Sequence, residues 1–183
     1  MDRIKFIEYL IQEDLPYEDT GDKIIIEGND SVFIKLDSIP EGVEFQNMGS
    51  VFLQFLEILP KGIKFSNDGP VVLGSLKSLP KETQFMNRGG VSLKNIKELP
   101  DGIEFNNKGT VSLNSLTSLP KNIIFNNSSN VFLNSLTVKG ITKGAEFKNR
   151  EGILIGRGGQ KSLDVDGMSR NRVMNCMIQD IGN

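Results

Sequence analysis

The segment LPDGIEFNNKGTVSLNSLTS, residues 99–118, is one copy of a pattern that recurs every 20 residues along the chain. In each copy a proline is followed five residues later by a phenylalanine and seven residues later by an asparagine. The prolines are Pro40, Pro60, Pro80, Pro100 and Pro120, the phenylalanines are Phe45, Phe65, Phe85, Phe105 and Phe125, and the asparagines are Asn47, Asn67, Asn87, Asn107 and Asn127. A constant period of this kind indicates a repeat protein.

Each copy contains two short stretches in which apolar and polar residues alternate. Ile103 and Phe105 flank a glutamate, and Val111 and Leu113 flank a serine. Alternation with a period of two predicts short strands that are buried on one face, and the intervening glycine and proline residues favour corners. A unit this short cannot bury its own apolar face, so the copies must stack on one another. We therefore predict an all-β fold, a short parallel β-solenoid of about six to seven 20-residue coils.

The inward positions of such a solenoid repeat from coil to coil. We expect the phenylalanines to stack as an aromatic column and the asparagines to form a buried ladder whose amides bond the backbone of the corners. A sixth copy carries a two-residue insertion near 138–143, which moves the phenylalanine to Phe147 and the asparagine to Asn149. A weaker copy before Pro40 is also predicted, with Ile25, Phe33 and Leu36 in phase with the repeat.

Both ends of a solenoid must be covered, because each would otherwise expose an unpaired strand edge. Near the start, an apolar stripe has helical spacing and comprises Ile4, Ile7, Leu10 and Ile11. A second stripe follows Ser169 and comprises Val173, Met174, Met177, Ile178 and Ile181. We predict one domain in three parts: an N-terminal helical cap at 1–22, solenoid repeats at 23–167 and a C-terminal helix at 168–183. That last helix could equally pair with a second copy, which would give a homodimer.

The composition argues against several functional classes. A net charge of −2 lacks the basic footprint of a nucleic-acid-binding protein, and no segment is apolar enough to predict a membrane span. The 183 residues include no histidine, the commonest general base and metal ligand, so we expect no metal, no cofactor and no catalytic residues. The single cysteine, Cys176, is interpreted as a packing residue. Without a signal peptide at the start or a disulfide, we expect a cytoplasmic protein.

The unit from Ser115 to Asn127, SLTSLPKNIIFNN, resembles repeats of known bacterial and phage proteins. It is similar in part to the 20-residue leucine-rich repeats of bacterial effectors, which place their asparagine differently and lack the second V-x-L strand. It more closely resembles small phage-encoded and prophage-encoded proteins that combine such repeats with a C-terminal helix, over about residues 23–181. This resemblance implies the architecture and a location in the cytoplasm of an infected or lysogenic bacterium, but no activity or site residues. By analogy with small phage proteins that block host machinery, such as anti-CRISPR and other anti-defence inhibitors, we expect a host protein or complex as the partner.

Functional residues are expected on the outward columns, because core packing occupies the inward ones. The first three coils carry large apolar residues where later coils carry serine, asparagine and lysine, namely Val32, Ile34, Phe52, Phe55, Ile58 and Val72. An exposed apolar cluster marks an interaction surface, so we predict a non-enzymatic protein-binding module that uses these six residues. The alternative is that the N-terminal helix folds back and covers them. Residues 1–30 also carry a net charge of −6, which suits a solvated face or a basic partner.

Two further features suggest other functions. Glu104 and Glu146, in one outward column, would lie two coils and therefore about 10 Å apart, near the upper limit for an inverting glycosidase. A glycan-binding or glycan-cleaving β-helix is accordingly the alternative function. The glycine-rich segment at 156–159 lacks the spacing of a phosphate-binding loop and is interpreted as a turn. A purely structural module also remains open.

Overall fold

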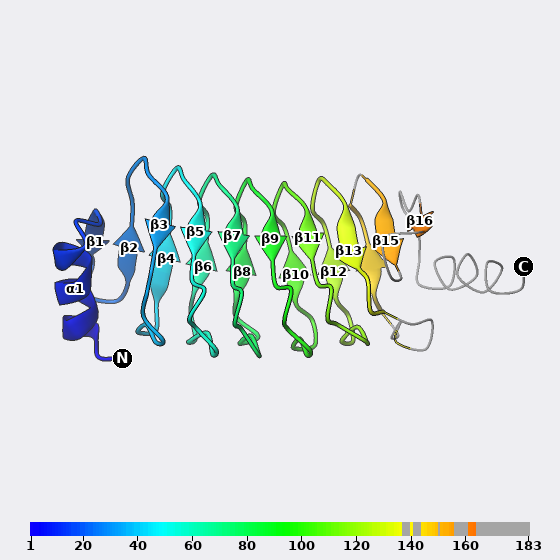
Figure 1. Ribbon diagram of the computed structural model, residues 1–183, viewed down its shortest axis with the longest axis horizontal. Coiled ribbons are helices and arrows are strands. Elements are labelled where there is room, and N and C mark those ends of the chain that lie inside the picture. The colour runs from blue at the N-terminus through cyan, green and yellow to red at the C-terminus, as the bar shows by residue number, and fades with distance from the viewer. Residues whose placement is uncertain (137–139, 141–143, 150, 156–160, 164–183) are drawn as a thin grey trace, which may run out of the picture.

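The computed structural model describes residues 1–136, 140, 144–149, 151–155 and 161–163. It shows a parallel β-solenoid whose coils stack into a rod (Figure 1), which confirms the predicted fold class. The predicted C-terminal helix at 168–183, Cys176 and the glycine-rich segment at 156–159 lie outside the described residues. Within the described residues, no helix has the length and apolar character needed to cross a membrane.

The strands of the described residues form two sheets that run along the rod. Sheet 1 contains β1 (Tyr17–Asp19), β2 (Ile24–Ile26), β4 (Val43–Phe45), β6 (Lys64–Phe65), β8 (Gln84–Phe85), β10 (Glu104–Phe105), β12 (Ile124–Phe125) and β14 (Glu146–Phe147). Sheet 2 contains β3 (Val32–Phe33), β5 (Val51–Phe52), β7 (Val71–Val72), β9 (Val91–Ser92), β11 (Val111–Ser112), β13 (Val131–Leu133), β15 (Ile153–Ile155) and β16 (Lys161–Leu163). Pairing is parallel except at β1–β2 and β15–β16, where the terminal strand of each sheet is antiparallel.

The aromatic column lies at the centre of the rod. Phe85 pairs with Phe105 at a spacing of 20 residues, and Phe125 pairs with Phe147 across the predicted insertion. The inward rings from Phe45 to Phe147 stack with centroids 5.2 to 5.5 Å apart. Leucine, isoleucine and valine from both sheets and from the segments before the prolines fill the rest of the core. The repeat therefore produces a continuous core because equivalent side chains lie directly above one another.

The buried asparagine ladder is also confirmed. The side-chain amide of Asn87 donates to the carbonyl oxygens of Gly69 in the preceding coil, at 3.2 Å, and of Gly89 in its own coil, at 2.9 Å. Asn107 makes the equivalent bonds to Gly89 and Gly109. Buried carbonyls without partners would destabilise the fold, so the ladder ties each corner to the one before it.

The corner after each proline is where one coil departs from the others. Gly42, Gly62 and Gly102 have φ of +71°, +71° and +75°, a conformation that glycine adopts without strain. The corresponding residue after Pro80 is Glu82, and there the Thr83 hydroxyl donates to the carbonyl oxygen of Pro80 at 2.9 Å. This coil therefore turns the corner through a side-chain hydrogen bond.

The predicted register of the first coil is wrong by one residue. Ile24 pairs with Val43 and Val32 pairs with Val51, a spacing of 19. Ile39 nevertheless keeps the spacing of 20 to Leu59, and both are buried, so the first coil is one residue shorter after Ile34. Side chains alternate between faces along a strand, and a shift of one residue therefore exchanges the inward and outward sets.

Helix α1 (Arg3–Gln12) lies across the N-terminal end of the rod (Figure 1). It buries Phe6 and Leu10, while Ile4 and Ile11 of the predicted stripe are exposed. Apolar residues occur on more than one side of this helix, and packing against the end of the core selects the face with Phe6. Residues after the helix continue the cap as β1, which pairs with β2.

One tyrosine closes the N-terminal edge of sheet 2. The Tyr9 hydroxyl donates to the carbonyl oxygen of Phe33 at 3.3 Å and accepts from the backbone N–H of Lys35 at 3.1 Å. These backbone groups belong to the first strand of the sheet and the residues just after it, where another coil would otherwise bind. The cap therefore blocks an edge that could template further strand pairing.

Candidate protein-binding surface

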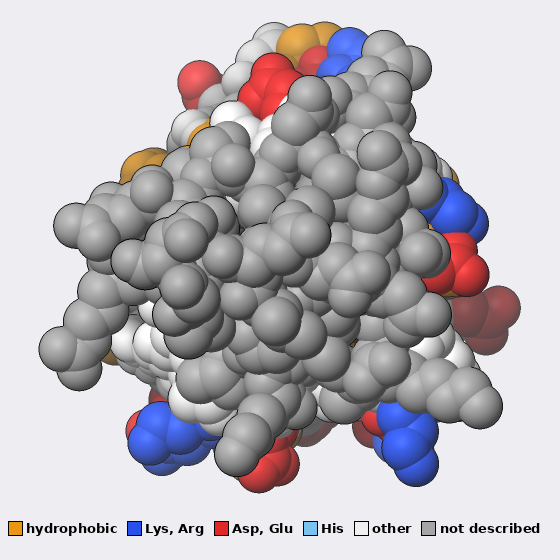
Figure 2. All heavy atoms as spheres, turned by 90° about the vertical axis from the view of Figure 1, so that its right-hand side faces the viewer, with side chains coloured by type: hydrophobic (Ala, Val, Ile, Leu, Met, Phe, Trp, Pro, Cys, Tyr) orange, Lys and Arg blue, Asp and Glu red, His pale blue; other side chains and the backbone are white. Residues whose placement is uncertain are grey.

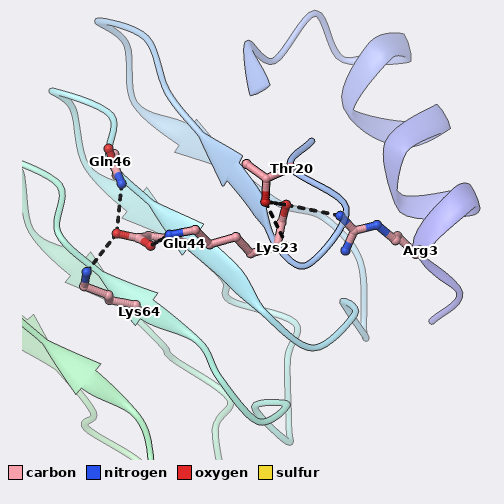
Figure 3. A network of polar contacts seen from close by, with 6 residues as sticks. All are labelled: Arg3, Thr20, Lys23, Glu44, Gln46 and Lys64. Atoms are coloured by element: carbon pink, nitrogen blue, oxygen red, sulfur yellow. Dashed lines mark hydrogen bonds and ion pairs between the residues drawn. The ribbon is translucent and has the colours of Figure 1, made fainter. Parts of the chain in front are cut away.

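The outer face of sheet 1 carries a buried ionic cluster near the N-terminal end (Figure 3). The Glu44 carboxylate, 6% exposed, accepts from the Nζ atoms of Lys23 at 3.0 Å and Lys64 at 2.9 Å, and from Gln46 at 2.8 Å. Arg3 of α1 bonds Asp19 and the carbonyl oxygen of Lys23, which ties the cap to the same region. Because two lysines bond the same carboxylate, the cluster indicates a structural role, namely to connect the first coils of the rod.

The same cluster predicts a dependence of stability on pH. Burial opposes ionisation of Glu44, but hydrogen bonds from Lys64, Lys23 and Gln46 outweigh it and lower its pKa from 4.5 to about 2. A lowered folded-state pKa stabilises the fold above pH 4.5, and this contribution is lost as the pH falls from 4.5 towards 2. We expect a loss of about 2 kcal/mol from this group, below the limit of about 3 kcal/mol that the full shift would allow. Urea unfolding measured between pH 6 and pH 2 tests this value.

The control for this prediction removes the same carboxylate. In Glu44→Gln the free energy of unfolding should fall less steeply with acid than in the native protein. Glu104→Gln deletes a carboxylate from an exposed position in the same column, so it controls for the change in net charge. An acid-induced loss of equal size in the native protein and in Glu44→Gln would contradict the assignment.

The outer face of sheet 2 carries large apolar side chains at its N-terminal end. Phe33 of β3 is 52% exposed and stacks on Phe52 of β5, with ring centroids 4.4 Å apart. Val72 follows in the same column, because Phe52 pairs with Val72. Phe55, in the loop after β5, is 57% exposed. We call Phe33, Phe52, Phe55 and Val72 the apolar patch.

The apolar patch borders one open hollow, and a second is formed by the segments that follow β3 and β5. The first, of about 580 Å³, is lined by residues that include Glu13, Leu15, Phe33, Phe52 and Phe55. The second, of about 560 Å³, is lined by Ile58 and by residues that include Asp37, Ile39, Glu57 and Pro60. Ile58 is 69% exposed. Apolar side chains therefore line recesses as well as a surface, which is the shape that docks a protruding side chain of a partner.

The structure separates the six residues predicted for binding. Phe52, Phe55, Ile58 and Val72 are at least partly exposed on the N-terminal coils. Val32 and Ile34 were predicted to face outward and are instead 2% exposed, because the short first coil turns them into the core. Phe33 takes the outward position and was missed. The run Val32-Phe33-Ile34 is apolar throughout, so alternation within it could not reveal which residue faces out.

Helix α1 does not cover the patch. It lies over the end of the rod (Figure 1), whereas the patch residues belong to β3, β5, β7 and the loop after β5. Phe33, Phe55 and Ile58 all remain more than half exposed. The alternative in which the N-terminal helix folds back over these residues is therefore wrong.

Charge is distributed unevenly along the chain. Residues 1–60 contain thirteen acidic and four basic side chains, a net charge of −9, whereas residues 61–183 carry +7. In the view along the rod from its C-terminal side, acidic and basic side chains are both visible around the outline (Figure 2). Glu13 and Lys35, which line the first hollow, pair at 3.6 Å, and Glu57, which lines the second, pairs with Lys77 at 2.6 Å. Phe33, Phe52 and Phe55 of the apolar patch therefore lie in the acidic part of the chain.

A third hollow, on sheet 1, contains one of the two glutamates considered for glycan chemistry. It measures about 350 Å³ and is lined by residues that include Glu82, Gln84, Met86, Glu104 and Asn106. It opens at the corner where Glu82 replaces glycine.

The third hollow is lined by Glu104 and not by Glu146. Glu104 is two strands from Glu146, with Ile124 paired between them. Glu104 accepts from Asn106 at 3.3 Å, and Glu146 pairs with Lys148 at 2.6 Å. Each carboxylate therefore has its own local partner.

Comparisons of the chain with protein-family models, with curated proteins and with solved structures found no match.

Proposed function

We propose that this protein is a non-catalytic binding module that docks a partner protein through the apolar patch. The observation that carries this proposal is the stack of Phe33 on Phe52 beside Phe55, with two of these three rings more than half exposed. Contiguous exposed aromatic side chains mark interaction surfaces in soluble proteins. The parallel ladders beneath the rings hold them in fixed positions, which lowers the entropic cost of binding.

The resemblance of the repeat to small phage and prophage proteins supports a narrower proposal. In that setting the partner is a protein complex of a bacterial host, and binding blocks its function in defence or regulation. This part of the proposal rests on the resemblance and on analogy with phage inhibitors, and it guides the choice of lysate for the test below.

The binding proposal predicts that a double variant, Phe33→Asp with Phe55→Asp, loses its partner. Both side chains are exposed, so the variant should remain folded, while charges in the centre of an interface should weaken binding at least about a hundredfold. The measurement is capture from bacterial lysate with the native chain and the variant, followed by binding of the purified partner. Met48→Asp is the matched control, because it places the same charge on another exposed apolar side chain.

The outcomes of this experiment are distinct. A partner that binds the native chain and Met48→Asp directly, but not the double variant, supports the apolar patch. A partner that binds all three proteins equally assigns the function to another surface. If circular dichroism shows that the double variant is unfolded, the single variants Phe33→Ser and Phe55→Ser replace it.

A glycan-binding function is the second candidate, because the hollow at Glu82 interrupts the repeat and is lined by Gln84, Glu104 and Asn106. Carboxylate and amide groups are suited to sugar hydroxyls. A screen of soluble oligosaccharides with the native protein, Glu104→Gln and Glu146→Gln tests this function. Binding that is lost in Glu104→Gln would favour it over the apolar patch, and release of reducing ends that is lost in either variant would indicate cleavage.

A further inference from the structure

The hollow beside Phe33 combines aromatic rings with a carboxylate. Phe33 stacks on Phe52 through one ring face, and β3 is the first strand of sheet 2. The opposite face of Phe33 is therefore turned towards the N-terminal end, where Glu13 and Leu15 line the same hollow. Phenyl faces attract cations, and a nearby carboxylate adds to that attraction. The recess is thus built from the groups that hold a cationic side chain against an apolar wall.

A lysine of the chain already occupies part of this position. The Nζ atom of Lys35 lies 3.6 Å from a carboxylate oxygen of Glu13, and the Lys35 side chain is 69% exposed. Exposed ion pairs of this length contribute little to stability, because water screens them and both side chains lose freedom. Lys35 can therefore swing away from Glu13 without weakening the fold. The pair shows that a cation fits beside Glu13 in the hollow that Phe33 also lines, and its weakness makes that cation replaceable.

Acidic residues continue along the patch. The second hollow, which contains Ile58, is also lined by Asp37 and Glu57, and residues 1–60 have a net charge of −9. Glu57 already pairs with Lys77, so a purely apolar partner segment would cover Asp37 and the net negative charge of this region. A segment that carries lysine or arginine would instead neutralise that charge as its apolar residues meet the rings. The charge distribution thus distinguishes between the classes of partner that an apolar patch alone would admit.

We propose that the docked partner segment is basic as well as apolar, and that one of its lysine or arginine side chains displaces Lys35 from Glu13 and lies against Phe33. This inference rests on the proposed protein-binding function and names the chemistry of the partner. Aromatic or aliphatic side chains of the segment occupy the recesses beside Phe55 and Ile58. Its remaining basic side chains lie towards Asp37 and Glu57.

Selection from a library of random peptides displayed on phage tests this inference and does not require the partner to be identified first. The immobilised native protein should enrich peptides that combine aromatic or aliphatic residues with lysine or arginine. A selected peptide is then synthesised, and its dissociation constant is measured by fluorescence anisotropy at low and high salt. Affinity should fall with salt, because the contacts are charged and accessible to solvent.

Three single variants separate the charge contribution from the apolar one. Glu13→Gln should raise the dissociation constant of the peptide about fivefold. Lys35→Gln should lower it about threefold, because the competing cation is removed. Glu18→Gln is the matched control: it removes one negative charge from β1 of the other sheet and should leave the dissociation constant unchanged. The double variant Phe33→Asp with Phe55→Asp should abolish binding.

The remaining outcomes overturn the inference in distinguishable ways. The proposal of a basic partner would be wrong if the peptides that depend on the patch were not enriched in lysine or arginine. It would also be wrong if Glu13→Gln and Lys35→Gln left the dissociation constant unchanged. In both cases the proposed binding function would still hold. If no selected peptide depends on Phe33 and Phe55, both proposals fail. A doubled mass in light scattering that is lost in the double variant would assign the patch to a second copy of this chain.

Discussion

Replacement of Gly89 by alanine is expected to lower the free energy of unfolding by about 3 kcal/mol or more. A Cβ atom at this position would lie 2.3 Å from the backbone carbon of Gly69 and 2.3 Å from the backbone nitrogen of Pro70. Those atoms belong to the preceding coil and cannot rotate away as a side chain could. The two coils would have to separate, which would strain the amide bonds from Asn87 to Gly69 and Gly89.

The control for this prediction is Gly74→Ala, a chemically identical change in the neighbouring coil. An added Cβ at Gly74 would meet no atom within 4 Å. The free energy of unfolding of that variant should therefore lie within about 0.5 kcal/mol of the native value. Urea unfolding followed by circular dichroism measures both. Equal losses in the two variants would contradict contact between the coils as the cause, because the lower entropy of the unfolded chain after a Gly→Ala change favours the folded state in both.

Removal of one ring from the aromatic column is expected to destabilise the fold by about 3 to 5 kcal/mol. In Phe105→Ala the lost ring lies between Phe85 and Phe125, at centroid distances of 5.3 and 5.5 Å, and is fully buried. Neighbouring coils are held in register by the parallel ladders on both sides, so they cannot collapse into the cavity. The penalty should therefore lie towards the upper end of that range.

The same substitution at an exposed position provides the control. Phe55→Ala removes an identical group from a side chain that is 57% exposed, and should change the free energy of unfolding by less than about 1 kcal/mol. The two variants should also differ in their effect on binding, because Phe55→Ala should weaken binding to a partner although the protein stays folded. A loss below about 1 kcal/mol in Phe105→Ala would mean that the column is not the main source of stability.

The function proposed here depends on departures from the repeat. A regular solenoid presents the same outward residues on every coil, whereas the column of Phe52 changes to Ser92 and Ser112 in the middle coils and to Phe132 in the next one. The N-terminal coils replace those serines with large apolar side chains, although the core beneath is unchanged. The outward substitutions therefore do not serve packing, and this is the physical reason to look for a partner there.

Part of the candidate surface could be predicted from the sequence and part could not. Phe52, Phe55 and Ile58 were identified correctly as outward, because the proline and phenylalanine columns set the phase of their coil. Phe33 was missed, and Val32 and Ile34 were assigned to the wrong face, because the first coil is one residue short and its apolar run has no alternation. The hollow that joins Glu13 to Phe33 had no sequence signal, since the two residues come from separate elements.

The sequence by itself determined the coil, the aromatic column and the asparagine ladder. A 20-residue period places identical side chains above one another, and the apolar ones can then be buried only in one shared core. Tertiary structure alone decided the register of the first coil, the face of α1 that is buried, and the exposure of the apolar patch. Those three features depend on how a non-repeating segment packs against the end of the rod. Such packing is set by long-range contacts, and no local periodicity encodes it.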